Sequence, residues 1–207
     1  MSITTKRPPI KETVGAQYIC FNTMTEDKEW TKNYEPDVER TAVVKKVTVT
    51  ENAESNDVYA SGEVYDTESA MSSISIEVEV IAFPADTIAR MRGETVETSG
   101  LILSGSKNER PFFAYGKVVK LKGGHVRYEW FPKCKLVENS DEASTREESF
   151  SEQTDTITIK AYAFDEKGNI RSKADSSASN FPETLTEEQF FGKPILANDD
   201  LETAIAG

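Results

Sequence analysis

The residues that could carry chemistry are few in this chain of 207 residues. Its single histidine, His125, follows a Gly-Gly pair, where a solvent-facing turn residue is the simplest interpretation. Glu77 and Glu79 stand two apart, a spacing that suits paired carboxylates in acid–base catalysis but also the wet face of a sheet. The sequence contains no nucleophile elbow, phosphate-binding loop or zinc-protease motif. It therefore predicts no catalytic residue, no cofactor-binding residue and no enzyme.

Two cysteines, Cys20 and Cys134, lie within apolar strand patterns. In a protein made in a reducing cytosol, this pattern favours two buried free thiols. One histidine and two distant cysteines do not supply the four close ligands of a structural zinc site. We therefore expect no metal site.

The charge balance restricts the possible partners. With 24 basic and 36 acidic residues, the formal net charge is −12. This argues against a groove that grips nucleic acid, which needs an excess of Lys and Arg, but not against a surface that nucleic acid passes without sticking. The first 15 residues lack the apolar run of a secretory signal, and no stretch approaches the ~20 apolar residues of a membrane helix.

Short apolar and β-branched runs predict six or seven strands. The clearest covers residues 73–82, where Ile and Val alternate with Ser and Glu, as in a sheet with one wet face. A helix is predicted over 84–92, with Pro84 in its first turn and Gly93 after its end. The remaining expected strands cover 16–21, 41–50, 58–65 and 154–164, and 101–103 is a short apolar run. We also expect a solvated loop over 51–57, a turn over 167–169, and a short helix over 186–191 that opens with a TEEQ capping box.

Residues 112–137 predict a β-hairpin that turns at Gly123-Gly124. Pairing Lys122 with His125 fixes the register, and one face is then apolar except for Lys117 opposite Trp130. The facing pairs in this register are Leu121–Val126, Val119–Tyr128, Tyr115–Pro132 and Phe113–Cys134 on the apolar face, with Lys120–Arg127, Val118–Glu129 and Ala114–Lys133 on the other.

The hairpin is a basic island, with six Lys or Arg and one Glu, whereas residues 138–155 hold seven acids and one Arg. These opposite charges indicate complementary surfaces, within a subunit or between stacked rings, or else two independently solvated segments. Tyr128, Trp130 and Phe131 suit stacking on bases or sugars, yet core packing is the simpler account of Tyr128 and Trp130. Phe131 falls on the opposite face and is the better candidate for an exposed contact.

Three pieces of the chain carry a family resemblance: Gly15-Ala-Gln-Tyr-Ile, the strand over 73–82 with the following Pro-Ala-Asp-Thr-Ile, and the hairpin with Tyr115-Gly116 and the Tyr-x-Trp-x-Pro-Lys segment over 128–133. An acidic connection and the Thr-rich TDTITIKAYAF follow in the same order. Together they resemble the major tail proteins of long-tailed bacteriophages of Gram-positive hosts. The resemblance covers about residues 15–164, and the segment beyond Phe181 has no counterpart.

The order of elements predicts a mainly β fold, an antiparallel β-sandwich or barrel with one flanking α-helix and extended N- and C-terminal arms. We expect one domain over 1–207, with an N-terminal arm over 1–14, a core over 15–180 and a C-terminal arm over 181–207. The resemblance implies a tail tube protein, without catalysis, that forms hexameric rings stacked into the hollow tube through which DNA passes without specific binding. It also implies the tape measure, tail terminator and distal tail proteins as partners, and location in the virion after assembly in the host cytoplasm.

The sequence also suggests which residues line the channel and which residues contact neighbouring subunits. Alternating polarity predicts a channel lining that includes Ser73, Ser75, Glu77 and Glu79, since acidic side chains repel phosphate. The candidates for contacts between subunits are Glu51, Glu54, Asp57, Lys120, Arg127, Lys133, Glu147 and Glu148. The alternatives are another tail ring, such as a terminator or distal tail protein, and a monomeric β-sandwich that binds carbohydrate through Trp130 and its neighbours.

Overall fold

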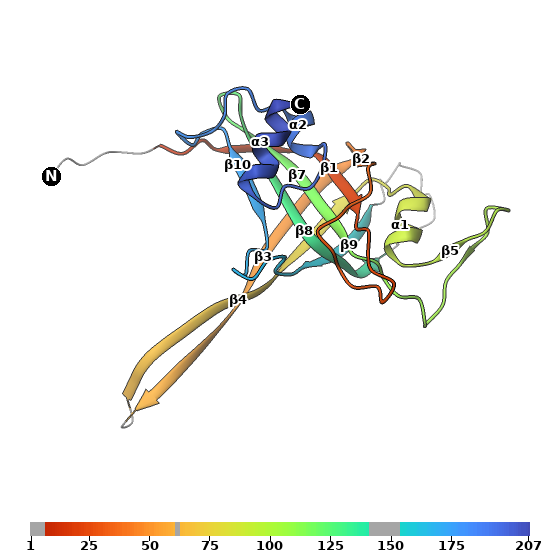
Figure 1. The fold of residues 1–207 in the computed structure, drawn as a ribbon, viewed down its shortest axis with the longest axis horizontal. Coiled ribbons are helices and arrows are strands. Elements are labelled where there is room, and N and C mark those ends of the chain that lie inside the picture. The colour runs from red at the N-terminus through yellow and green to blue at the C-terminus, as the bar shows by residue number, and fades with distance from the viewer. Residues whose placement is uncertain (1–6, 61–62, 141–153) are drawn as a thin grey trace, which may run out of the picture.

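The computed structural model describes residues 7–60, 63–140 and 154–207. In these ranges the chain is mainly antiparallel β-structure, as expected, with three short helices (Figure 1). The strands are β1 (Lys11–Phe21), β2 (Glu39–Thr41), β3 (Val44–Ala60), β4 (Glu63–Val80), β5 (Thr95–Val96), β6 (Ile102–Leu103), β7 (Phe113–Leu121), β8 (His125–Ser140), β9 (Asp155–Ala161) and β10 (Ser172–Asp175). The helices are α1 (Ala85–Met91), α2 (Glu187–Phe191) and α3 (Asn198–Ala206).

A single large sheet forms the body of the subunit. Its strand order is β2-β1-β7-β8-β9-β4-β3, and β10 pairs with β8 outside this path. β5 and β6 form a separate two-stranded hairpin that extends from the body beyond α1 (Figure 1). β2 and β3 lie at the two ends of the order and β10 pairs with β8 alone, so among the described residues each of these three strands has an edge available to another chain.

The central strands β1, β7 and β8 are buried on both faces. One core, which we call the first core, contains apolar residues of β1, β4, β7, β8 and β9 together with Met91 of α1. The second core lies on the opposite face, where residues of β1, β7 and β8 meet Leu185, Phe190, Phe191 and Ile195 of the C-terminal segment.

The hairpin of β7 and β8 is present, but its register differs by one residue from the prediction. Leu121 pairs with His125, so the loop contains three residues, and both glycines in it have positive φ angles of 86° and 80°. A bulge between Phe113 and Tyr115 then returns Phe113 to its predicted partner Cys134. The prediction was wrong here because two glycines in sequence do not distinguish a two-residue turn from a three-residue loop.

The prediction that one side of this hairpin is polar and exposed is also wrong. Tyr128 and Trp130 pack in the second core, as expected, but Phe131 lies in the first core and is 0% exposed. Lys117 faces Glu129 instead of Trp130. The error follows from the register and from treating the hairpin as covered on one face only.

Residues 51–57 form part of β3 and not a loop, and residues 58–65 contain the end of β3 and the start of β4 instead of one strand. The pairing of β3 with β4 continues to Ala60 and Glu63, so the two strands project from the body as a long hairpin (Figure 1). A projecting hairpin has no core to face and hence no apolar alternation, which is why its polar sequence suggested a loop.

The predicted helix over 84–92 is confirmed as α1, with Thr87, Ala89 and Met91 buried. The predicted capping box is confirmed at α2, where Thr186 accepts a hydrogen bond from the backbone of Gln189 and the Gln189 side chain returns to the backbone of Thr186.

The extended C-terminal arm is not observed, because residues 181–207 fold onto the sheet. Phe191 stacks on Tyr18 with ring centroids 3.9 Å apart, and Trp130 donates a hydrogen bond of 2.9 Å to the carbonyl of Phe190. The apolar residues that anchor this segment are irregularly spaced among acids, so the sequence showed no helix face. The N-terminal arm is shorter than expected, since Lys11 to Val14 already pair with β7.

Replacing Gly116 by Ala should destabilise the subunit. A Cβ atom at this position would lie 2.8 Å from Phe191 Cε1 and 3.0 Å from Trp130 Cε3, in the second core. We expect a loss of about 1–3 kcal/mol in the free energy of unfolding, measured by urea denaturation. Gly105→Ala, at an exposed loop position, is the matched control, and equal stability of the two variants would contradict tight packing at Gly116.

Candidate assembly surfaces

A polar face runs across β3, β4, β9 and the end of β8, with the first core behind it. Its centre is formed by Glu77 and Glu79, and Ser75 lies in the next row. The register aligns three rows across the four strands: Lys46, Glu79, Thr156 and Ser140; Thr48, Glu77, Thr158 and Glu138; Thr50, Ser75, Lys160 and Lys135. We call these twelve residues the polar face.

The predicted channel residues share this side of β4, with one difference. Glu77 is exposed and Ser75 and Glu79 are half-buried, but Ser73 is only 3% exposed and takes a hydrogen bond from Asn52. The sequence predicted an acidic surface here, but three lysines and three glutamates on the polar face balance one another, so it is neither acidic nor basic. It therefore lacks the Lys and Arg excess that retains phosphate.

Lysines at one end of this surface lie against aromatic rings. Lys133 Nζ is 5.1 Å from the ring centroid of Trp30 and 5.7 Å from that of Phe112, and Lys135 Nζ is 4.2 Å from Phe112. Lys160 Nζ lies 5.8 Å from the ring of Tyr162. These three lysines and three rings form what we call the lysine–aromatic cluster. Lys133 was nominated from the sequence; the rings around it were not.

The other nominated contact residues have different surroundings. Arg127 forms an ion pair with Asp175 of the same subunit at 2.7 Å, and Glu51 forms one with Arg171 at 2.8 Å. Lys120 is exposed beside the hairpin loop. Glu54 and Asp57 belong by their backbone to the projecting part of β3, while Glu147 and Glu148 lie outside the described residues.

A buried ion pair joins the neighbouring strands β7 and β8, and the sequence analysis did not predict it. Lys117 Nζ is 3.1 Å from Glu129 Oε2, and the two residues are 8% and 5% exposed. Burial lowers the pKa of Lys117, while the Glu129 carboxylate opposes this effect. Gln17, the backbone partner of Lys117, is fully buried and has no hydrogen-bond partner for its Nε2 among the described residues. The feature of the sequence that could have indicated this ion pair is Glu129, the only acidic residue in 112–137.

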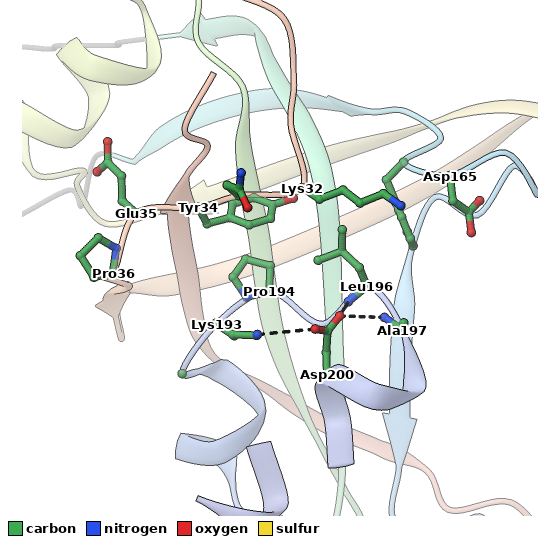
Figure 2. Close-up of a pocket in the computed structure, with 13 residues that line it drawn as sticks. Lys32, Tyr34, Glu35, Pro36, Asp165, Lys193, Pro194, Leu196, Ala197 and Asp200 are labelled. Atoms are coloured by element: carbon green, nitrogen blue, oxygen red, sulfur yellow. Dashed lines mark hydrogen bonds and ion pairs between the residues drawn. The ribbon is translucent and has the colours of Figure 1, made fainter. Parts of the chain in front are cut away.

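A groove of about 660 Å³ separates residues 32–36 from the C-terminal segment (Figure 2). Of the three acidic residues that line it, Asp200 accepts hydrogen bonds of 3.0 Å from the backbone N–H groups of Leu196 and Ala197 and lies 3.5 Å from Lys193 Nζ. Glu35 pairs with Arg90, and Asp165 accepts hydrogen bonds from the backbone N–H groups of Lys167 and Asn169. Tyr34 donates a hydrogen bond of 2.9 Å to the carbonyl of Pro132. The contacts of Asp200 hold the start of α3, the Tyr34 contact ties the loop to β8, and none of these groups forms a catalytic arrangement.

Within residues 7–60, 63–140 and 154–207, no group of three or more His, Cys, Asp and Glu side chains is placed to hold a metal ion. His125 is exposed, and its Nδ1 lies 3.2 Å from Ser176 Oγ. No helix among the described residues has the length and hydropathy needed to cross a membrane. The proposed carbohydrate site at Trp130 is wrong, because this side chain is 0% exposed.

The sequence profile of a known family matches residues 35–194, and that family is described as phage tail tube protein. The chain belongs to the phage tail tube protein family. The match spans strands β2 to β10 and α2, and so includes the whole polar face and the projecting hairpin. No curated protein matches the chain. As a tail tube protein, the chain is a structural component of the phage tail, whereas the Gram-positive host rests on the sequence resemblance alone.

Both cysteines of this tail tube protein are free and buried, as expected. Burial raises the pKa of the Cys20 thiol to about 12 and raises the pKa of Cys134 as well. Since the thiolate is the reactive form, neither thiol should react with a disulfide reagent in the native protein at pH 8. Thiol titration should find both groups only after unfolding in denaturant, and reaction of either one in the native state would contradict the burial.

Proposed function

We propose that this subunit closes into hexameric rings that stack into the hollow tail tube, with the polar face turned towards the channel. The observation that carries the proposal is the polar face itself, an exposed and charge-balanced surface whose other side is the first core. A conduit for DNA must not hold its cargo, and a wall of Thr, Ser and balanced Lys and Glu offers no net attraction for phosphate.

Ring closure would be heterologous, with one edge of the sheet against the opposite edge in the next subunit. β3 is the long free edge and has one strand partner among the described residues, β4. The edge at the other end of the order, β2, is only three residues long. Such an edge of unpaired backbone groups is a template for another chain, so β3 is the element best suited to a contact between subunits.

The projecting hairpin of β3 and β4 is a second contact element. It extends beyond the subunit body (Figure 1), and an isolated two-stranded hairpin is at best marginally stable in water. Packing on a neighbouring subunit would supply the missing support. This part of the chain includes Glu54 and Asp57, which were nominated for such contacts.

Sedimentation velocity over a range of protein concentrations tests this proposal. A tube subunit should form polymers whose mass increases with concentration, because stacking has no internal limit. A tail terminator or distal tail protein, the alternative functions, should stop at the mass of one ring. The tube also requires proteins at its two ends and a tape measure inside it, which we expect as partners in the virion after assembly in the host cytoplasm.

Reversing the charge of Glu77 and Glu79 to Lys should convert the polar face into one that retains DNA. The face would then carry a clear excess of lysine, and we expect assembled protein to bind a short DNA duplex about tenfold more tightly at physiological salt. Fluorescence anisotropy measures this affinity. Glu77→Gln with Glu79→Gln is the neutral control, and unchanged DNA affinity of the lysine variant would place these residues outside the channel.

A further inference from the structure

The lysine–aromatic cluster places like charges against one another. Lys135 and Lys160 are direct cross-strand partners, and Lys133 lies two residues away on the same side of β8. Like charges directly opposite one another destabilise a sheet. No carboxylate of the described residues lies within ion-pair distance of these three ammonium groups. In a protein of net charge −12, such an arrangement is suited to receiving an anionic partner.

The aromatic rings keep the three ammonium groups in place. Trp30 comes from the loop before β2, Phe112 precedes β7, and Tyr162 follows β9, so three segments of the chain converge on the lysines. A cation held over a ring face retains its charge while its stem stays packed. The cluster is therefore a preorganised positive surface, which costs less ordering on binding than three free lysines would.

The opposite end of the same two strands carries the opposite charge. β8 and β9 end with the pair Ser140 and Thr156, and Glu138 is exposed one row before it. The sequence that connects the strands, 141–153, contains five acids and one Arg. One strand pair thus has a basic end at Lys133, Lys135 and Lys160 and an acidic end about five residues, or roughly 17 Å, further along.

We propose that the lysine–aromatic cluster binds the acidic connection 141–153 of a second copy of this chain, and so joins stacked copies head to tail. A contact between two different surfaces of identical chains is heterologous and propagates into a filament, whereas a self-complementary contact would stop at a dimer. The opposite charges at the two ends of one strand pair fix the polarity of stacking. This inference rests on the proposed tube function and names the surfaces that its stacking would use.

DNA is the other polyanion that this phage protein meets. Lys135 and Lys160 belong to the polar face as well as to the cluster, and the three glutamates of that face offset its lysines, which makes a poor DNA site. The observations favour the acidic segment, because the sequence itself supplies a matching acidic partner. Binding of DNA is accordingly an outcome of the test.

The test uses two charge-reversed variants of the full chain. One carries Lys133→Glu, Lys135→Glu and Lys160→Glu; the other carries Glu142→Lys, Glu147→Lys, Glu148→Lys and Glu152→Lys, which change the net charge of residues 141–153 from −4 to +4. Each variant alone should lose polymerisation, seen as a return to monomer in light scattering, and an equimolar mixture should regain it because the reversed surfaces complement each other.

The control for the lysine variant makes the same charge change at exposed positions elsewhere, with Lys107→Glu, Lys122→Glu and Lys173→Glu. Triple Lys→Met substitution in the cluster keeps the stems packed and should also weaken polymerisation.

Several results would overturn the proposal. Normal polymerisation of either charge-reversed variant alone would do so, as would recovery only when all seven substitutions are combined in one chain, since the contact would then lie within a subunit. Loss of DNA affinity by the lysine variant with polymerisation unchanged would assign the cluster to DNA.

A peptide experiment separates this proposal from the tube function. If the wild-type protein forms no polymer, the tube function fails, and the cluster is judged by a synthetic peptide of residues 138–153 titrated into the monomer. If the peptide binds the wild-type monomer, and its affinity falls at least tenfold in the Lys→Glu variant and in high salt, the lysine–aromatic cluster is supported as its binding site. If the peptide does not bind the wild-type monomer, the proposal is overturned.

Discussion

Replacing residues 55–69 with an Asn-Gly turn is expected to abolish polymerisation and leave the subunit folded. Glu54 and Ala70 are cross-strand partners, so a two-residue turn can connect them without changing the register of the remaining hairpin. The removed part projects from the body (Figure 1), so the free energy of unfolding should stay within about 0.5 kcal/mol of wild type.

Light scattering and urea denaturation of the same sample give the two readouts. A matched control shortens the hairpin of β5 and β6 instead, by joining Val96 to Ile102 through Asn-Gly. Since those residues are also cross-strand partners, the control makes the same kind of change elsewhere on the surface. Full polymerisation of the variant without residues 55–69 would show that the long hairpin is not an assembly element.

Removing one partner of the buried ion pair is expected to be the most damaging single substitution in the subunit. Glu129→Leu would leave the Lys117 ammonium buried without its carboxylate, and breaking a buried pair in this way costs about 3–5 kcal/mol. This is a large part of the roughly 5–15 kcal/mol that stabilises a typical domain. Urea denaturation of the monomer measures the loss.

The double variant Lys117→Met with Glu129→Leu is the control, because it removes both charges and keeps the volume. It should recover most of the lost stability, since apolar replacement of a whole buried pair is often neutral. A double variant as unstable as Glu129→Leu would show that the polar side chains contribute through contacts other than their charge.

The same single variant should show a characteristic pH dependence. Burial lowers the pKa of Lys117, so between that lowered value and the ordinary value of 10.5 the unfolded chain binds more protons than the folded one. The stability of Glu129→Leu should therefore increase as the pH rises through this window. Stability that falls or stays level relative to wild type would contradict a buried, unpaired ammonium group.

The sequence predicted the parts of the fold where one local pattern determines the structure. Residues 73–82 alternate apolar and polar side chains because one face of β4 meets the first core and the other faces outward, so the strand and its polar side were both apparent. The TEEQ sequence over 186–189 encodes the cap within four residues, and α2 begins at its second residue. Both predictions depend on near neighbours in the chain.

The features that depend on distant contacts were not predictable in this way. Burial of both hairpin faces is set by the C-terminal segment, whose Phe190 and Phe191 reach Tyr128 and Trp130 from sixty residues away. The sequence of the projecting hairpin does not alternate between apolar and polar residues, so it gave no strand signal although β3 and β4 pair there. The lysine–aromatic cluster unites three separate segments, so its lysines were visible in the sequence but its rings were not.

Electron microscopy of the purified protein at increasing concentration tests the central claim most directly. The proposed function predicts long hollow filaments built from stacked hexameric rings, with the strands of the polar face bordering the channel in a reconstruction. Single rings that do not stack, or particles that remain monomeric at every concentration, would contradict it.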